Sequence, residues 1–162
     1  MKLFLKNLLF TVVVPGTVTV WLPYAWFWGQ RDFESAPWRW LAYVLITAGT
    51  AVYLRCVADF MFAGRGTPAP IDPPKTLVAR GLYRYVRNPM YLGAGLAMLG
   101  AASYYGSPVL LAYVAGFMAA CHALVRLYEE PALHRLFGAE YDVYRALTPR
   151  WLPGRGSSGG GL

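Results

Sequence analysis

The sequence has few charged residues, and acidic ones are especially scarce. Only 14% of the 162 residues are charged, with 8 Asp and Glu against 15 Lys and Arg, while 57% are hydrophobic. Average globular chains carry roughly a quarter charged residues. This shortage of charge excludes intrinsic disorder and a coiled coil. The composition indicates a small membrane protein whose net charge of +7 must lie outside the hydrocarbon.

Cysteine is scarce as well. Cys56 and Cys121 are the only two, each lies in an apolar run, and neither has a partner at metal-binding spacing. A disulfide scaffold is therefore excluded, and we predict no metal site. We expect both residues to behave as small buried hydrophobic side chains.

Long apolar runs are what the sequence does have. A bilayer core of about 30 Å needs roughly 20 mostly apolar residues per helix. Four stretches come close to this requirement: Leu8–Leu22, Trp38–Met61, Met90–Tyr105 and Pro108–Tyr128. No small-residue cleavage site follows the first, so we interpret it as a retained helix, kinked at Pro15-Gly16. The predicted fold is all-α, an integral membrane bundle of about four transmembrane helices.

The basic residues gather on one side of this topology. Twelve of the fifteen lie before the first span, between the second and third, or at the inner end of the fourth and beyond it. The positive-inside rule therefore predicts an inner-membrane protein with both termini in the cytoplasm. Because topology accounts for the charge, we predict no nucleic-acid partner. Tryptophans cluster around the first outer loop, which favours an interfacial aromatic belt over a cofactor-stacking box.

A proline-rich segment before the third span has features that membrane anchoring alone does not require. Its prolines, from Pro68 to Pro74, favour an extended path. Arg87 then precedes Pro89, which is suited to the first turn of the third span. A helix N-terminus beside an arginine is a ready anion site. Gly93 and Gly95 would leave the backbone bare for a ligand, although Gly93 also forms a stripe of small residues with Ala97 and Ala101 that suits helix packing.

The end of the fourth span carries a second polar group. His122, Arg126 and Glu129 share one helical face, and Glu130 follows. Ionisable groups at this depth are costly and often functional. The alternative is a set of interfacial ion pairs in which Arg126 pairs with Glu130. Spacing alone does not separate the two interpretations.

The remaining segments are predicted to support this site. Apolar residues from Leu133 to Leu147 recur at helical spacing after Pro131, which predicts an amphipathic cytoplasmic helix. We assign 1–153 to a single domain and 154–162 to a flexible tail. Arg55 and Asp59, four residues apart in the second span, are interpreted as a mutually neutralising pair.

An ordered set of motifs in the second half of the chain resembles a known family. It begins with Arg87-Asn88-Pro89-Met90-Tyr91-Leu92-Gly93 and continues with Glu129-Glu130-Pro131-Ala132-Leu133, Phe137-Gly138, Tyr141, Tyr144 and Pro149-Arg150. In order and spacing, residues 66–153 resemble the isoprenylcysteine carboxyl methyltransferase and phospholipid methyltransferase superfamily of integral membrane enzymes. The carboxyl methyltransferases usually have His where this chain has Asn88, whereas Asn is similar to the phospholipid branch.

The resemblance implies an enzyme that binds S-adenosylmethionine at the cytoplasmic ends of its last helices. The residues implied to bind this cofactor are Tyr91, Gly93, Gly95, His122, Glu129, Glu130, Tyr141 and Tyr144. Arg87, Glu130 and Arg150 are the candidate catalytic residues. A glutamate suits the ammonium of the cofactor, and an arginine or the helix N-terminus suits its carboxylate.

The sequence does not identify the methyl acceptor. The expected partners are membrane lipids and a lipophilic small-molecule acceptor bearing a carboxylate, an amine or a thiol. A carboxylate needs no base, whereas an amine must first lose a proton, for which Glu130 or His122 are candidates. The alternatives are a phospholipid N-methyltransferase of the ethanolamine type and, from another class, a non-catalytic helical membrane protein or partner subunit.

Overall fold

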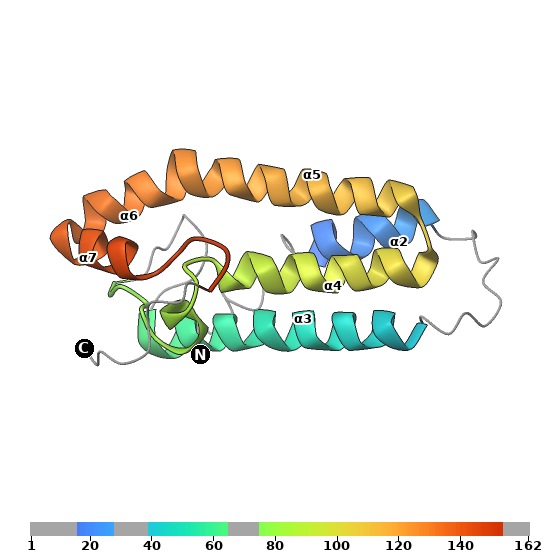
Figure 1. Cartoon of the computed structure of the whole chain (residues 1–162), viewed down its shortest axis with the longest axis horizontal. Helices are drawn as coiled ribbons and strands as arrows, with labels where there is room; N and C mark the ends of the chain where they lie inside the picture. Colours follow the sequence, from blue (N-terminus) through green and yellow to red (C-terminus); the bar gives the residue numbers. More distant parts are fainter. Residues whose placement is uncertain (1–15, 28–38, 65–74, 154–162) are drawn as a thin grey trace.

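Three long helices form the body of the protein. The computed structural model describes residues 16–27, 39–64 and 75–153. Within these ranges the chain is helical, with no strand, which confirms the predicted all-α class for this part. Helices α3 (Arg39–Asp59), α4 (Pro89–Tyr105) and α5 (Pro108–Leu124) run lengthwise, with α4 between the other two (Figure 1).

Among the described residues, two helical runs are long and apolar enough to cross a membrane. They are Arg39–Phe62 and Pro108–Phe137, which correspond to the second and fourth predicted spans. Helix α4 has 17 residues and follows the third predicted span closely. Four crossings and their orientation remain predictions. The predicted flexible tail and the proline-rich segment up to Pro74 lie outside the described residues.

The first predicted span is described only from Gly16 onward. There the chain is helical through η1 (Thr17–Trp21) and α2 (Leu22–Phe27), so the helix continues beyond the expected end at Leu22. The expected kink at Pro15 lies outside the described residues.

Two prolines are accommodated by π-helical turns rather than by helix ends. The Leu22 amide, just before Pro23, donates to the carbonyl of Thr17, five residues back. In the same way the Glu130 amide, just before Pro131, donates to Val125 in the π turn η4 (Val125–Glu129). Proline lacks an N–H and crowds the carbonyl four residues back, and a wider turn relieves both problems. Pro131 therefore lies in the first turn of the helix Glu130–Phe137, which agrees with the predicted helix start, while the helical backbone continues without a break over Pro108–Phe137.

Close contact between α3 and α4 depends on glycine. A Cβ at Gly49 of α3 would collide with the backbone nitrogen of Ala97 of α4. A Cβ at Gly100 would lie 2.8 Å from the carbonyl oxygen of Ala42. Small residues let membrane helices approach this closely. The packing interpretation of the small stripe on the third span therefore agrees with the structure at Ala97.

The C-terminal part consists of two short helices, where the sequence predicted one. They are α6 (Glu130–Phe137) and α7 (Ala139–Leu147). Gly138 between them has φ +52°, a conformation that side chains disfavour and glycine adopts freely. The chain reverses there, and α7 lies against the polar end of the bundle (Figure 1). Tyr141 of α7 is only 1% exposed, so this helix is packed rather than loosely attached.

Candidate active site at the polar end of the bundle

The segment before α4 is packed against the end of α3. Val78, Tyr83 and Met90 form a buried cluster with Cys56 of α3. Gly81 has φ +59°, and a Cβ there would collide with the carboxylate of Asp59. This position therefore requires glycine twice, for its backbone angle and for its contact. The packing fixes the direction in which the chain enters Arg87 and Asn88.

Arg87, Glu130 and Arg150 meet at one point. Arg150 donates two hydrogen bonds to the Glu130 carboxylate, Nε to Oε1 at 2.7 Å and Nη2 to Oε2 at 2.9 Å. Arg87 Nη1 lies 3.1 Å from the same Oε1. The Glu130 and Arg87 side chains are only 11% and 10% exposed. The three candidate catalytic residues thus form a single ion-paired cluster, and Glu130 pairs with these two arginines rather than with Arg126.

The C-terminal segment is fastened to the start of α4 by backbone contacts. The Arg87 amide donates to the Pro149 carbonyl at 2.9 Å, and Asn88 Nδ2 donates to the Arg150 carbonyl at 3.2 Å. Tyr144 donates its hydroxyl hydrogen to the Tyr83 carbonyl at 2.8 Å. Residues far apart in the sequence therefore close this end of the bundle together.

Two tyrosines of α7 face the cluster as neutral phenols. Arg87 Nη1 donates to the Tyr141 hydroxyl at 3.3 Å. Burial, followed by the Glu130 charge, raises the pKa of Tyr141. Burial also raises the pKa of Tyr144. Because a phenol is protonated below its pKa, both tyrosines act at neutral pH as hydrogen-bonding groups without charge.

Glu129 lies beside the cluster but has a different partner. Tyr91 of α4 donates a hydrogen bond to Glu129 Oε1. Glu129 is close enough to Glu130 for the two carboxylates to interact electrostatically. The two glutamates of the predicted pair therefore have different partners. Glu130 is held by two guanidinium groups, while Glu129 accepts from one neutral hydroxyl.

His122 contacts a residue that sequence reasoning did not identify. Trp151 donates from its indole Nε1 to His122 Nδ1 at 3.0 Å, and the two rings stack with 6.1 Å between centroids. An indole nitrogen only donates, so Nδ1 must accept and the hydrogen of a neutral imidazole lies on Nε2. In this arrangement His122 presents a donor rather than a base. In the sequence, only its position directly after the Pro149-Arg150 motif indicated that Trp151 could belong to the site.

One nitrogen of Arg87 has no partner. Its Nε is buried and makes no hydrogen bond with the described residues. A buried donor without an acceptor costs about 1–3 kcal/mol. The cluster also carries one net positive charge, because two guanidinium groups share one carboxylate. Both observations favour an anionic ligand beside Arg87.

Other predicted residues have different surroundings. A Cβ at Gly93 would lie 2.8 Å from the backbone nitrogen of Tyr53, and one at Gly95 would lie 2.8 Å from the sulfur of Met118. Both glycines therefore allow helix packing, and their predicted place in the cofactor pocket has no support in this geometry.

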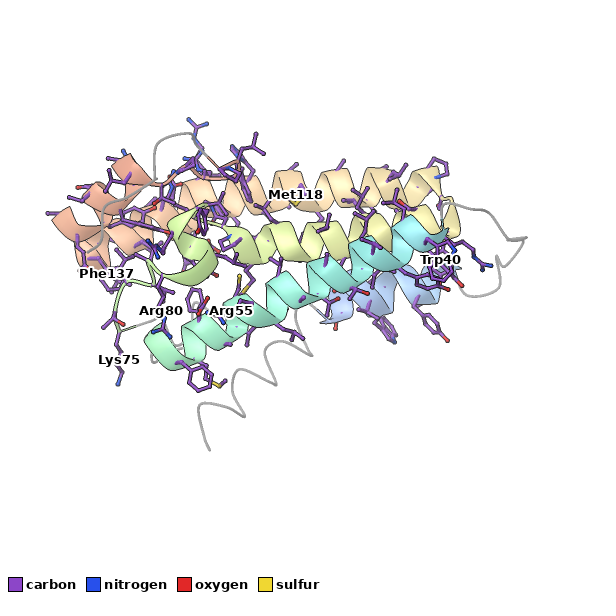
Figure 2. All side chains as sticks on the ribbon, turned by 60° about the horizontal axis from the view of Figure 1, so that its bottom comes forward. Trp40, Arg55, Lys75, Arg80, Met118 and Phe137 are labelled. Atoms are coloured by element: carbon purple, nitrogen blue, oxygen red, sulfur yellow. The ribbon has the colours of Figure 1, made fainter. Side chains whose placement is uncertain are left out.

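Arg55 Nη2 lies 3.4 Å from Asp59 Oδ1, in agreement with the neutralising pair, and Arg80 also approaches Asp59. Figure 2 shows Arg55 and Arg80 toward the same end as Phe137.

The fold and the site together define a class of protein. It is a small helical protein with two membrane-length helices and a buried ionic cluster at one end. The family model described as phospholipid methyltransferase matches residues 37–140, which is more than half of the chain. The chain therefore belongs to the phospholipid methyltransferase family, within the superfamily that its motifs resemble. No curated protein and no solved structure matches it significantly. Family membership and the apolar helices indicate a membrane methyltransferase.

Proposed function

We propose that this protein transfers a methyl group from S-adenosylmethionine to a lipidic or otherwise apolar acceptor, at the cytoplasmic face of the membrane. The observation that carries the proposal is the charge pattern at the polar end. One surplus positive charge and the unpaired Arg87 Nε lie in the same cluster as Glu130, next to a second carboxylate on Glu129. The amino-acid part of the cofactor has the complementary pair, a carboxylate and an ammonium.

Each group has a defined task under this proposal. Arg87 binds the carboxylate of the cofactor through its free Nε, and Glu129 binds the ammonium. Glu130 and Arg150 are positioning residues, because Arg150 fixes the Glu130 carboxylate through paired hydrogen bonds and that carboxylate holds the guanidinium of Arg87 by an ion pair. The cofactor itself supplies a methyl group on an electrophilic sulfonium. Alignment in a site closed to water then accounts for most of the rate.

A phospholipid amine is the second candidate acceptor. The description of the matching family favours it. An amine must lose a proton, and Glu130 is a poor base because two guanidinium groups stabilise its charged form. Nδ1 of His122 already accepts from Trp151, so this nitrogen is not available as a base. Glu129 is then the remaining carboxylate of the cluster that is positioned to take the proton.

Replacing Glu129 by glutamine tests the proposal and separates the two roles. Glu129→Gln removes a charge-assisted contact, so we expect the affinity for S-adenosylmethionine to fall about tenfold or more. The measurement is equilibrium titration of the purified full-length protein in nanodiscs with radiolabelled cofactor. If Glu129 serves as a base instead, turnover falls while the cofactor affinity stays normal.

The matched control is Glu140→Gln, which makes the same change on the exposed side of α7. We expect this control to bind the cofactor like the wild type. Absence of saturable binding by the wild-type protein overturns the enzyme proposal. Normal cofactor affinity and normal turnover in Glu129→Gln would show that the role of Glu129 is structural.

A further inference from the structure

A cavity lies away from the charged cluster, along the side of α4 that faces α3 and α2. Its volume is about 480 Å³, within the range of about 300–1,000 Å³ typical of small-molecule sites. Its lining includes Thr50 and Tyr53 from α3 and Ala94, Ala97 and Ala101 from α4. Val20 and Tyr24 border it on a third side.

The cavity exists because α4 presents only alanine at these positions. Ala94, Ala97 and Ala101 are three and four residues apart, so they follow one face of the helix. Glycine contacts hold α3 and α4 together beside this face, so the space cannot close by further approach of the two helices. Leucine at any of these positions would fill part of the cavity.

The depth and chemistry of the cavity suit a hydrocarbon chain. Its α3 wall belongs to the membrane-length run Arg39–Phe62. The lining consists mainly of aliphatic and aromatic side chains, together with Thr19 and Thr50. At one end, Tyr104 is held by Arg39, whose Nη2 donates to the Tyr104 hydroxyl at 3.2 Å. A lipid chain is the apolar ligand that is abundant at this depth.

The opposite end of the cavity leads toward the candidate site. Tyr53 and Ala94 line this end. Ala94 is one helical turn beyond Tyr91, and Tyr53 is close enough to Tyr91 to interact with it electrostatically. Tyr91 in turn binds Glu129. A chain lying in the cavity would therefore bring its polar end to the Tyr91–Glu129 pair.

We propose that this cavity holds one acyl chain of a glycerophospholipid acceptor, with the headgroup of that lipid beside Tyr91 and Glu129. The inference rests on the proposed function, and it identifies the gap between α2, α3 and α4 as the acceptor site. It also gives the two substrates different binding surfaces, because the acceptor chain lies along α3 and α4 while the cofactor lies against Arg87 and Glu129.

Photolabelling tests the location. The probe is phosphatidylethanolamine with a diazirine in one acyl chain, added to the purified full-length protein in maltoside micelles and mapped by mass spectrometry. We expect label on the cavity walls of α3 and α4, and we expect unlabelled phosphatidylethanolamine to remove it. Label spread over the exposed face of α5, or label that does not compete, overturns the inference.

Matched alanine substitutions test the cavity itself. Ala101→Leu fills the cavity, whereas Ala115→Leu makes the same change on the exposed face of α5. We expect Ala101→Leu to lower the competed labelling severalfold at normal affinity for S-adenosylmethionine, and Ala115→Leu to change neither. Thr50→Leu, on the opposite wall, serves if Ala101→Leu does not fold.

The two proposals fail in different ways. Unchanged labelling in a folded Ala101→Leu or Thr50→Leu variant, with normal cofactor binding, overturns the acceptor site alone. Competed labelling of the cavity without any binding of S-adenosylmethionine overturns the proposed function, and with it the role of the bound lipid as acceptor.

Discussion

Glu130 organises the candidate site by holding two arginines at once. Its carboxylate takes two hydrogen bonds from Arg150 and an ion pair from Arg87. Removing one member of a buried ion pair is costly, because the remaining charge loses its partner without regaining water. We therefore expect the cluster to contribute to stability as well as to ligand binding.

Arg150→Ala tests this contribution. The Arg150 side chain is 27% exposed, so we expect the free energy of unfolding to fall by about 1–3 kcal/mol, the range for a lost hydrogen bond to a charged group. Chemical denaturation of the purified protein in detergent micelles measures the change. The control is Arg135→Ala on the exposed side of α6, which should stay within about 0.5 kcal/mol of the wild type. Equal stability of the two variants would contradict the structural role of the pair.

At the scale of the helices, glycine determines how closely α3 and α4 approach. Gly49, Gly93 and Gly100 lie where a Cβ would meet the backbone of the partner helix. Backbone atoms cannot move aside as a flexible side chain can, so the two helices would have to separate. That separation would also change the shape of the cavity beside α4.

Gly49→Ala and Gly116→Ala form a matched pair for this contact. A Cβ at Gly49 collides with the Ala97 backbone, whereas a Cβ at Gly116 of α5 meets nothing within 4 Å. We expect Gly49→Ala to lower the unfolding free energy by about 1–3 kcal/mol through overpacking. Gly116→Ala should raise it, by up to about 1 kcal/mol, through helix propensity. Equal and positive effects in denaturation experiments would show that α3 and α4 do not pack closely.

The sequence predicted the long helices better than it predicted their irregularities. Apolar runs predicted α3, α4 and α5 because a helix that crosses a bilayer needs roughly 20 mostly apolar residues in sequence. The π turn before Pro131 is different, because proline permits either a helix end or a widened turn, and only packing selects between them. The reversal at Gly138 was likewise ambiguous, since glycine also occurs inside helices.

For the candidate site too, the sequence predicted some features and missed others. The motif pattern grouped Arg87, Glu130 and Arg150 as candidate catalytic residues, although it did not show that one carboxylate contacts both arginines. The Trp151–His122 contact joins residues from two distant segments. The local sequence around either residue therefore does not predict the contact. The cavity beside α4 is a property of three-dimensional packing. Two of its alanines, Ala97 and Ala101, were therefore assigned to helix contact alone.

The whole molecule has a polar end and an aromatic end. Lys75 and Arg80 lie near one end of the bundle, and Trp40 lies near the other (Figure 2). Trp40 is 77% exposed, as expected for a side chain at a membrane interface. The orientation in which the basic end and the candidate site face the cytoplasm stays a prediction.

Reporter fusions test that orientation. We expect a green fluorescent protein fused after Leu162 to fluoresce in bacterial cells, and alkaline phosphatase fused at the same point to be inactive, because both report a cytoplasmic position. A fusion of alkaline phosphatase after Gly29, in the predicted outer loop, is the control and should be active. An active phosphatase after Leu162 would contradict the topology.

The most direct test of the account is transfer of the labelled methyl group to a lipid. Membranes enriched in the wild-type protein are incubated with S-adenosylmethionine labelled in its methyl group, and the lipid extract is separated and identified. The account predicts a labelled, lipid-soluble product that depends on the protein and falls at least tenfold in Glu129→Gln but not in Glu140→Gln. Lipid extracts that stay unlabelled at saturating cofactor, or labelling that is equal in both variants, would contradict it.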